Sequence, residues 1–143
     1  MSTEFSPGAV IAVAAIVFGF GVTVIMFRIQ RELEMRKKGE PSWIACSDHL
    51  IFASIFVSVF CVFLPTFLLP KFNCTVAIAR AGCVAAIILE AGYIPSILAH
   101  YRLGFGKNRI GGRTNPEPTE RLFIWIAAIL AIGCFVFVVR SNL

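Results

Sequence analysis

Residues 8–27 read GAVIAVAAIVFGFGVTVIMF, a run of twenty residues without a charged side chain. A helix rises about 1.5 Å per residue, so a run of this length crosses the roughly 30 Å hydrocarbon core of a bilayer. Glu4 precedes the run and no Lys or Arg does, whereas Arg28 and further basic residues follow it. This charge pattern predicts a spanning helix rather than a signal peptide, with its C-terminal end in the cytoplasm.

Three more apolar blocks of similar length follow, over residues 50–69, 76–99 and 122–139. With 58% hydrophobic residues in a chain of 143, the sequence has more apolar mass than so short a soluble domain buries. We therefore predict an all-α polytopic membrane protein with four transmembrane helices. Residues 1–143 form a single membrane domain in this prediction.

The basic residues give the predicted orientation. The segments 28–49 and 100–121 hold five Lys or Arg residues each, and the rest of the chain holds three. By the positive-inside rule both segments are cytoplasmic loops, so the N and C termini lie on the non-cytoplasmic side. The expected location is the plasma membrane or an endomembrane.

The start of the first loop is predicted to prolong the first helix into water. Glu32 and Arg36 stand four residues apart, the spacing of an ion pair on one helix face, and Gly39 with Pro41 ends the helix.

The net charge of +5 fits anionic lipid headgroups at the loops. We expect no nucleic-acid binding, because no basic stretch is interleaved with aromatic residues. The five cysteines form no CxxC pair, so neither a disulfide framework nor a zinc site is indicated. No metal and no cofactor is expected, and the expected partners are membrane lipids and other membrane proteins or further copies of this chain.

Glu90 is the one ionisable residue deep inside a predicted span, where a charge is costly, so its side chain should face protein. Ser58 of the second helix is expected at similar depth and is the predicted hydrogen-bond partner. Tyr93 lies on the same helical face as Glu90, and Ser54 belongs to the polar stripe of Ser58. The site is either a hydrogen-bonded structural carboxyl group or a proton or cation site.

Small residues spaced four apart predict close helix packing, at Ala15 and Gly19 on the first helix and at Gly82 and Ala86 on the third. These faces serve contacts within the protein or with another membrane protein.

Pro95 lacks the amide hydrogen that would bond to the carbonyl of Ala91, and Gly92 lies just before it. The third helix is therefore predicted to kink near its cytoplasmic end, as a fixed bend or as a hinge.

Four polar residues near the helix ends suggest other chemistry. His49 and His100 fall at one boundary, but their spacing is not diagnostic of a metal or haem site. Asn73 begins a glycosylation sequon in the short external turn, and Cys46 is a candidate for palmitoylation. No nucleophile with a base and no carboxylate pair can be placed together at one depth, so no enzymatic activity is expected.

The segment 92–101, which reads GYIPSILAHY, resembles the small stress-induced plasma-membrane proteolipid family. In that family the second of two helices ends in a Gly-Tyr-Ile-Pro-Gly segment followed by His-Ala and an aromatic residue. The likeness covers about residues 47–103, with Ser47-Asp48 opening the preceding helix, Leu64-Pro65 at a double-proline position, then Lys71 and Cys74 in order.

The chain departs from that pattern at Ser96, where the family has glycine, and at His100, which comes one position late. Glu90 and the outer two helices are not part of it. The resemblance implies a membrane protein without catalysis that influences cation tolerance and membrane potential. We accordingly expect a non-catalytic regulator of membrane potential or ion homeostasis. The alternatives are an accessory or assembly subunit of a larger membrane complex, and a proton or cation channel or transporter that uses Glu90.

Overall fold

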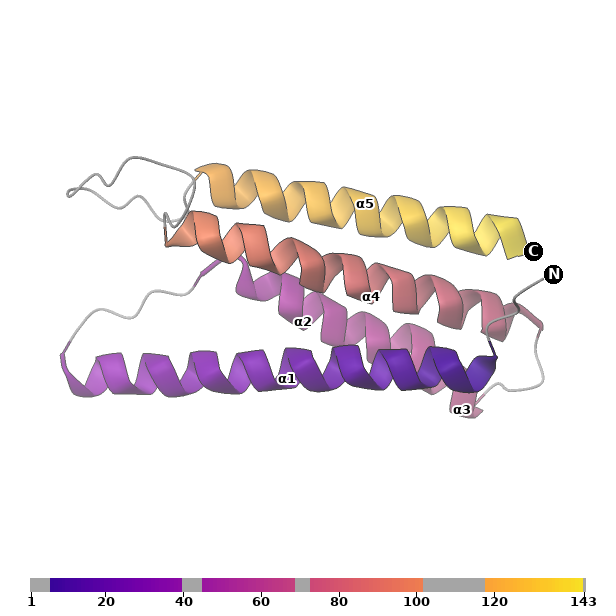
Figure 1. Cartoon of the computed structure of the whole chain (residues 1–143), viewed down its shortest axis with the longest axis horizontal. Coiled ribbons are helices and arrows are strands. Elements are labelled where there is room, and N and C mark those ends of the chain that lie inside the picture. The colour runs from indigo at the N-terminus through magenta and orange to yellow at the C-terminus, as the bar shows by residue number, and fades with distance from the viewer. Residues whose placement is uncertain (1–5, 40–44, 69–72, 102–117, 143) are drawn as a thin grey trace.

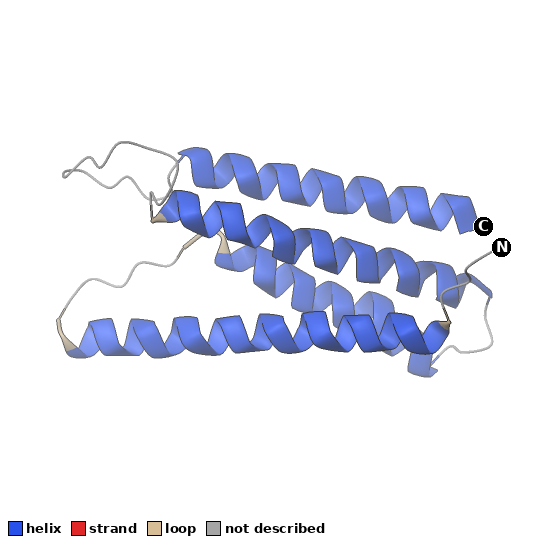
Figure 2. Ribbon diagram, viewed as in Figure 1, coloured by secondary structure: helices blue, strands red, loops and turns tan. Residues whose placement is uncertain are grey.

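The computed structural model describes residues 6–39, 45–68, 73–101 and 118–142. All regular elements of these residues are helices, as Figures 1 and 2 show. They are α1 (Pro7–Lys37), α2 (Asp48–Val57), η1 (Ser58–Phe63), α3 (Leu64–Leu68), α4 (Asn73–His100) and α5 (Pro118–Asn142). Four helical stretches are long and apolar enough to cross a membrane, which confirms the predicted fold class: Pro7–Lys37, Asp48–Leu68, Thr75–His100 and Pro118–Ser141.

The first helix has clear start and stop signals. Ser6 is the N-cap and its Oγ accepts a hydrogen bond from the amide of Ala9 at 3.3 Å, while Pro7 opens the first turn. The helix runs through Lys37, and Gly39 then adopts a φ of 73°. At about 1.5 Å per residue, its 31 residues are longer than a bilayer core requires, so the last turns extend beyond the apolar block.

The second span is not a uniform α-helix. Its central residues, Ser58–Phe63, form a π-helical turn that joins α2 to α3. Pro65 stands two residues after this turn and removes one amide donor from the helix, so the hydrogen-bond pattern changes in the turn before it. The apolar pattern of this block does not reveal the turn.

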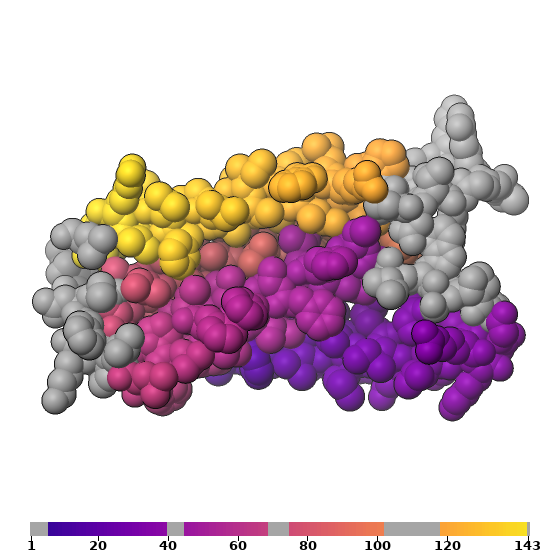
Figure 3. All heavy atoms as spheres, turned by 180° about the vertical axis from the view of Figure 1, so that it is seen from behind, coloured from indigo at the N-terminus to yellow at the C-terminus, as the bar shows by residue number. Residues whose placement is uncertain are grey.

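The helix α4 is central. It contacts α1, α2, η1, α3 and α5, whereas α1 and α5 do not contact each other in the described parts of the chain. The rear view in Figure 3 shows the second span lying between α1 and α5. Half of the most apolar 18-residue stretch of α4 is buried inside the protein, against 11% of the corresponding stretch of α5. The start of α1 and the end of α5 lie at the same end of the molecule, as expected for four helical stretches that alternate in direction (Figure 1).

The interior is built from small residues of α4. Ala86 is fully buried, and a Cβ added at Gly82 would lie 2.6 Å from the Cβ of Cys61. Gly92 packs against Ala127 of α5, where an added Cβ would overlap the alanine side chain. The helix α4 remains continuous through Gly92 and Pro95, so any bend there leaves it unbroken.

The two predicted stripes of small residues have different surroundings. Gly82 and Ala86 are interior, whereas Ala15 and Gly19 are exposed on the outer side of α1. The inner face of α1 consists of Val10, Ala14, Val17 and Gly21.

Candidate functional site

Glu90 lies where three of the four spans meet. Ser54 of α2 donates a hydrogen bond from its Oγ to Glu90 Oε1 at 3.2 Å. From the α1 side, a Cβ added at Gly21 would lie 2.9 Å from the same oxygen. The carboxyl group therefore occupies the space that the missing side chain of Gly21 leaves. Its side chain faces protein, where a carboxyl group inside a span can be hydrogen-bonded.

The prediction that Ser58 is the hydrogen-bond partner of Glu90 was wrong. Ser58 is fully buried, but its Oγ has no hydrogen-bond partner among the described residues, and Ser54 makes the contact instead. The prediction estimated the depths of Ser58 and Glu90 by counting residues from the cytoplasmic ends of their apolar blocks. It assumed that the second helix starts at Leu50. The helix begins at Asp48, and Glu90 meets a residue one turn nearer that start.

Tyr93, the other predicted member of this site, belongs to a polar cluster elsewhere. Its hydroxyl interacts electrostatically with Asp48 and Arg28. These two residues form an ion pair, with 3.2 Å between Arg28 Nε and Asp48 Oδ2. We call the end of the spans that carries this pair the charged end.

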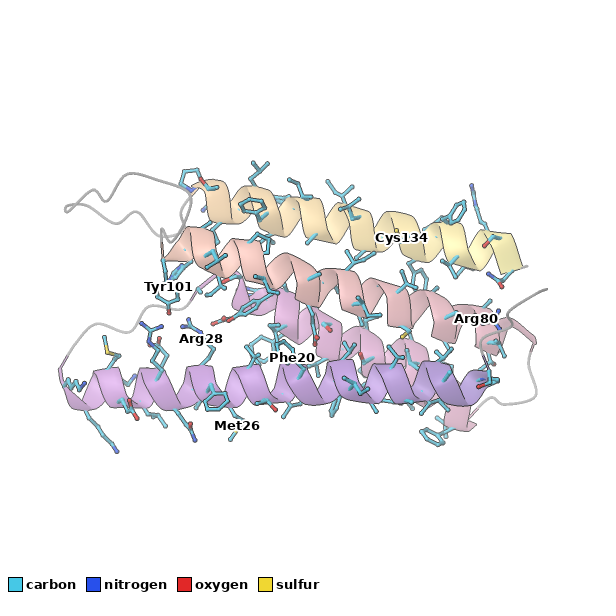
Figure 4. The ribbon with its side chains drawn as sticks, viewed as in Figure 1. Phe20, Met26, Arg28, Arg80, Tyr101 and Cys134 are labelled. Carbon is cyan, nitrogen blue, oxygen red and sulfur yellow. The ribbon has the colours of Figure 1, made fainter. Side chains whose placement is uncertain are left out.

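A tyrosine connects α1 to α4 at the charged end. Arg28 Nη1 donates to the hydroxyl of Tyr101 at 2.5 Å, and Arg31 donates to the same hydroxyl. The Arg31 guanidinium also stacks over the Tyr101 ring, 4.7 Å from its centroid. In Figure 4, Arg28 and Tyr101 point toward each other across the space between the two helices. The long helix α1 is thus held to the other spans at the charged end.

A buried carboxylate connects the other outer helix. Glu120 of α5 has no exposed surface; its Oε2 lies 3.0 Å from Nδ1 of His100, and its Oε1 accepts from the amide of Ser47 at 2.8 Å. The Oγ of Ser96 donates to the carbonyl of Glu120 at 3.4 Å. One residue therefore joins α5, α4 and the start of α2. Sequence reasoning missed this role, and the one signal was an acidic residue just before the last apolar block.

His49 and His100 do not come together as a ligand pair. The His100 ring is buried against Glu120, whereas the exposed His49 places its Nδ1 2.9 Å from the carbonyl of Cys46. Within the described ranges, no three His, Cys, Asp or Glu side chains gather in a way that would hold a metal ion. Burial, together with the charge of Glu120, raises the pKa of the Cys46 thiol. The side chain of Asn73 lies outside the described residues.

Comparisons with protein-family models, with curated proteins and with solved structures found no match. The resemblance to the proteolipid family over residues 47–103 stays a prediction.

Proposed function

We propose that this chain is a non-catalytic, multi-pass membrane protein that acts by binding another membrane protein side by side in the bilayer, as an accessory subunit. The outward direction of the small-residue stripe on α1 carries this proposal. Ala15, Gly19 and Thr23 are exposed, and a Cβ added at Gly19 would meet nothing within 4 Å. Thr23 Oγ1 donates to the Gly19 carbonyl at 2.8 Å, so the hydroxyl is satisfied within the helix.

Such a stripe lets two helix backbones approach closely in lipid, where packing rather than water drives association. The corresponding stripe on α4, at Gly82 and Ala86, already packs inside the protein. Among the described residues, nothing lies within 4 Å of a Cβ added at Gly19 of the stripe on α1. Because α1 and α5 do not contact each other in the described parts of the chain, α5 does not cover the outer face of α1.

The test is purification of the chain from its own membrane in mild detergent, with the parent compared to Gly19→Leu. We expect a stoichiometric membrane partner to co-elute with the parent and to be lost with Gly19→Leu. Gly133→Leu is the matched control, because a Cβ at that exposed glycine of α5 also meets nothing within 4 Å. Elution of the parent without a partner, or retention of the partner by Gly19→Leu, would contradict the proposal.

A second candidate is the regulation of membrane potential or ion homeostasis, with Glu90 as a proton or cation site. The observation that favours it is the contact of this carboxyl group with Ser54 and Gly21 between three spans. A carboxyl group within a membrane span is a recurrent element of ion pathways. In this case the purified parent conducts protons or cations in liposomes, and Glu90→Gln does not.

A further inference from the structure

A groove of about 250 Å³ separates α1 from α2 at the charged end. It is a different feature from the outer face of α1 and from the Glu90 site. Its wall is partly charged and partly apolar. The charged residues are Arg28, Glu32, Arg36 and Asp48, and the apolar ones include Ile25 and Phe52.

The depth of these residues matches the boundary between acyl chains and headgroups. Arg28 is the first charged residue after the uncharged run 8–27. Glu32 and Arg36 follow at intervals of four residues, so they lie on the same helix face, about 6 and 12 Å further along the axis. Ile25 lies about one turn on the other side of Arg28, toward the bilayer centre. A ligand in this groove would thus have a polar part next to the charges and an apolar part next to Ile25.

The charged residues of the groove have both a hydrogen-bond donor and hydrogen-bond acceptors without partners among the described residues. Among the described residues, three of its buried side-chain atoms have no partner: one donor, Arg28 Nη2, and two acceptors, Glu32 Oε2 and Asp48 Oδ1. Buried polar atoms are normally paired, and leaving one unpaired costs about 1–3 kcal/mol. The predicted ion pair between Glu32 and Arg36 does not form in the described part of the chain, so Glu32 is not neutralised along its own helix.

We propose that this groove binds a glycerophospholipid whose headgroup carries a primary ammonium, such as phosphatidylethanolamine. The lipid phosphate accepts hydrogen bonds from Arg28 and Arg36, and the ammonium donates to Glu32 and Asp48. The acyl chains lie along the apolar part of the wall. Two arginines and two carboxylates give the wall no net charge, which complements a zwitterionic headgroup.

Two other headgroups complement the wall less well. The quaternary ammonium of phosphatidylcholine has no N–H, so it cannot satisfy the acceptor on Glu32. Phosphatidylglycerol has no cation, so its phosphate can contact the two arginines but nothing in its headgroup pairs with the carboxylates of Glu32 and Asp48. The proposed site is therefore selective for the ammonium group and not only for the phosphate. The inference does not rest on the accessory-subunit proposal.

The experiment uses the full chain, purified in mild detergent and stripped of lipid, with native mass spectrometry of binding to phosphatidylethanolamine, phosphatidylcholine and phosphatidylglycerol of identical acyl chains. We expect phosphatidylethanolamine to bind about tenfold more tightly than phosphatidylcholine, since only its ammonium donates hydrogen bonds to Glu32 and Asp48. Glu32→Gln should reduce this preference several-fold, because a neutral amide oxygen accepts from an ammonium less strongly than a carboxylate does. Arg36→Gln should weaken the binding of all three lipids.

Glu34→Gln is the matched control, because Glu34 is exposed on the same helix two residues away and does not line the groove. It should bind all three lipids as the parent does. Equal binding of phosphatidylethanolamine and phosphatidylcholine by the parent would overturn the proposal. Tighter binding of phosphatidylglycerol would show an anionic-lipid site instead. If Glu32→Gln kept the full preference of the parent for phosphatidylethanolamine, the Glu32 carboxylate would not be what recognises the ammonium.

Discussion

Gly82 offers the most direct test of how α4 packs against the second span. A Cβ at this position would lie 2.6 Å from the Cβ of Cys61 and 3.3 Å from its carbonyl carbon. Ordinary contact begins at 3.4 Å, so the Cys61 Cβ would have to move away by about 0.8 Å to restore it. The carbonyl carbon belongs to the backbone, and the position of the Cys61 Cβ is set by the backbone, so a change of rotamer cannot relieve the contact. Gly82→Ala therefore requires the π-helical turn itself to shift.

Two opposing terms set the expected magnitude for Gly82→Ala. Overpacking a closely packed interior costs about 1–3 kcal/mol, whereas alanine in place of glycine favours a helix by up to about 1 kcal/mol. Because the contact involves backbone, we expect the overpacking term to win, with a net loss of about 1–2 kcal/mol.

The assay for this prediction is thermal unfolding in mild detergent, with Gly133→Ala as the control. A Cβ at Gly133 meets nothing within 4 Å, so this variant keeps only the helix-propensity gain and should be as stable as the parent or more so. If Gly82→Ala unfolds at the same temperature as Gly133→Ala, α4 and the second span do not approach as closely as described.

The other predictions concern Glu90, Cys46 and Glu120. Glu90→Gln should fold and insert normally and unfold within about 1 kcal/mol of the parent, because the amide oxygen still accepts from Ser54; a large loss of thermal stability would contradict this. In a variant that retains only the Cys46 thiol, a membrane-impermeant maleimide should label sealed vesicles from the cytoplasmic side and not from the outside, and the reverse pattern would invert the predicted orientation. Glu120→Gln should lower the free energy of unfolding by about 2 kcal/mol or more, since it removes the charge that His100 and the Ser47 amide face. Glu34→Gln is the control, because Glu34 is exposed. Equal unfolding temperatures of the two variants would exclude a structural role of Glu120.

The four spanning helices could be predicted from the sequence because each corresponds to a long apolar block, in which no single residue decides the prediction. An uncharged run such as residues 8–27 tolerates many changes of detail and still predicts a spanning helix. Gly82 and Ala86 pack inside the protein, as their spacing permits, but Ala15 and Gly19 have the same spacing and are exposed, so the pattern alone does not give the direction of a stripe.

Register between helices was less predictable. The hydrogen bond from Ser54 to Glu90 depends on where α2 starts and how α2 and α4 cross, and neither follows from the length of an apolar block. The π-helical turn before Pro65 has the same origin, since proline removes a hydrogen bond but does not determine which neighbouring residues rearrange. Glu120 was missed because its partners, His100 and Ser47, come from other parts of the chain.

The contacts of α1 on its inner side determine what it presents outward. Successive residues of a helix are rotated by about 100°, so Arg28 lies seven residues and about two turns after Gly21, on nearly the same face. Both residues make specific contacts there, Gly21 with Glu90 and Arg28 with Asp48, and two contacts at different heights prevent rotation of the helix about its axis. Gly19 is rotated by about 200° from Gly21 and must therefore face outward. The open small-residue stripe and the groove beside α2 thus depend on the same two anchors, and a change that breaks the Arg28–Asp48 pair should disturb both surfaces together.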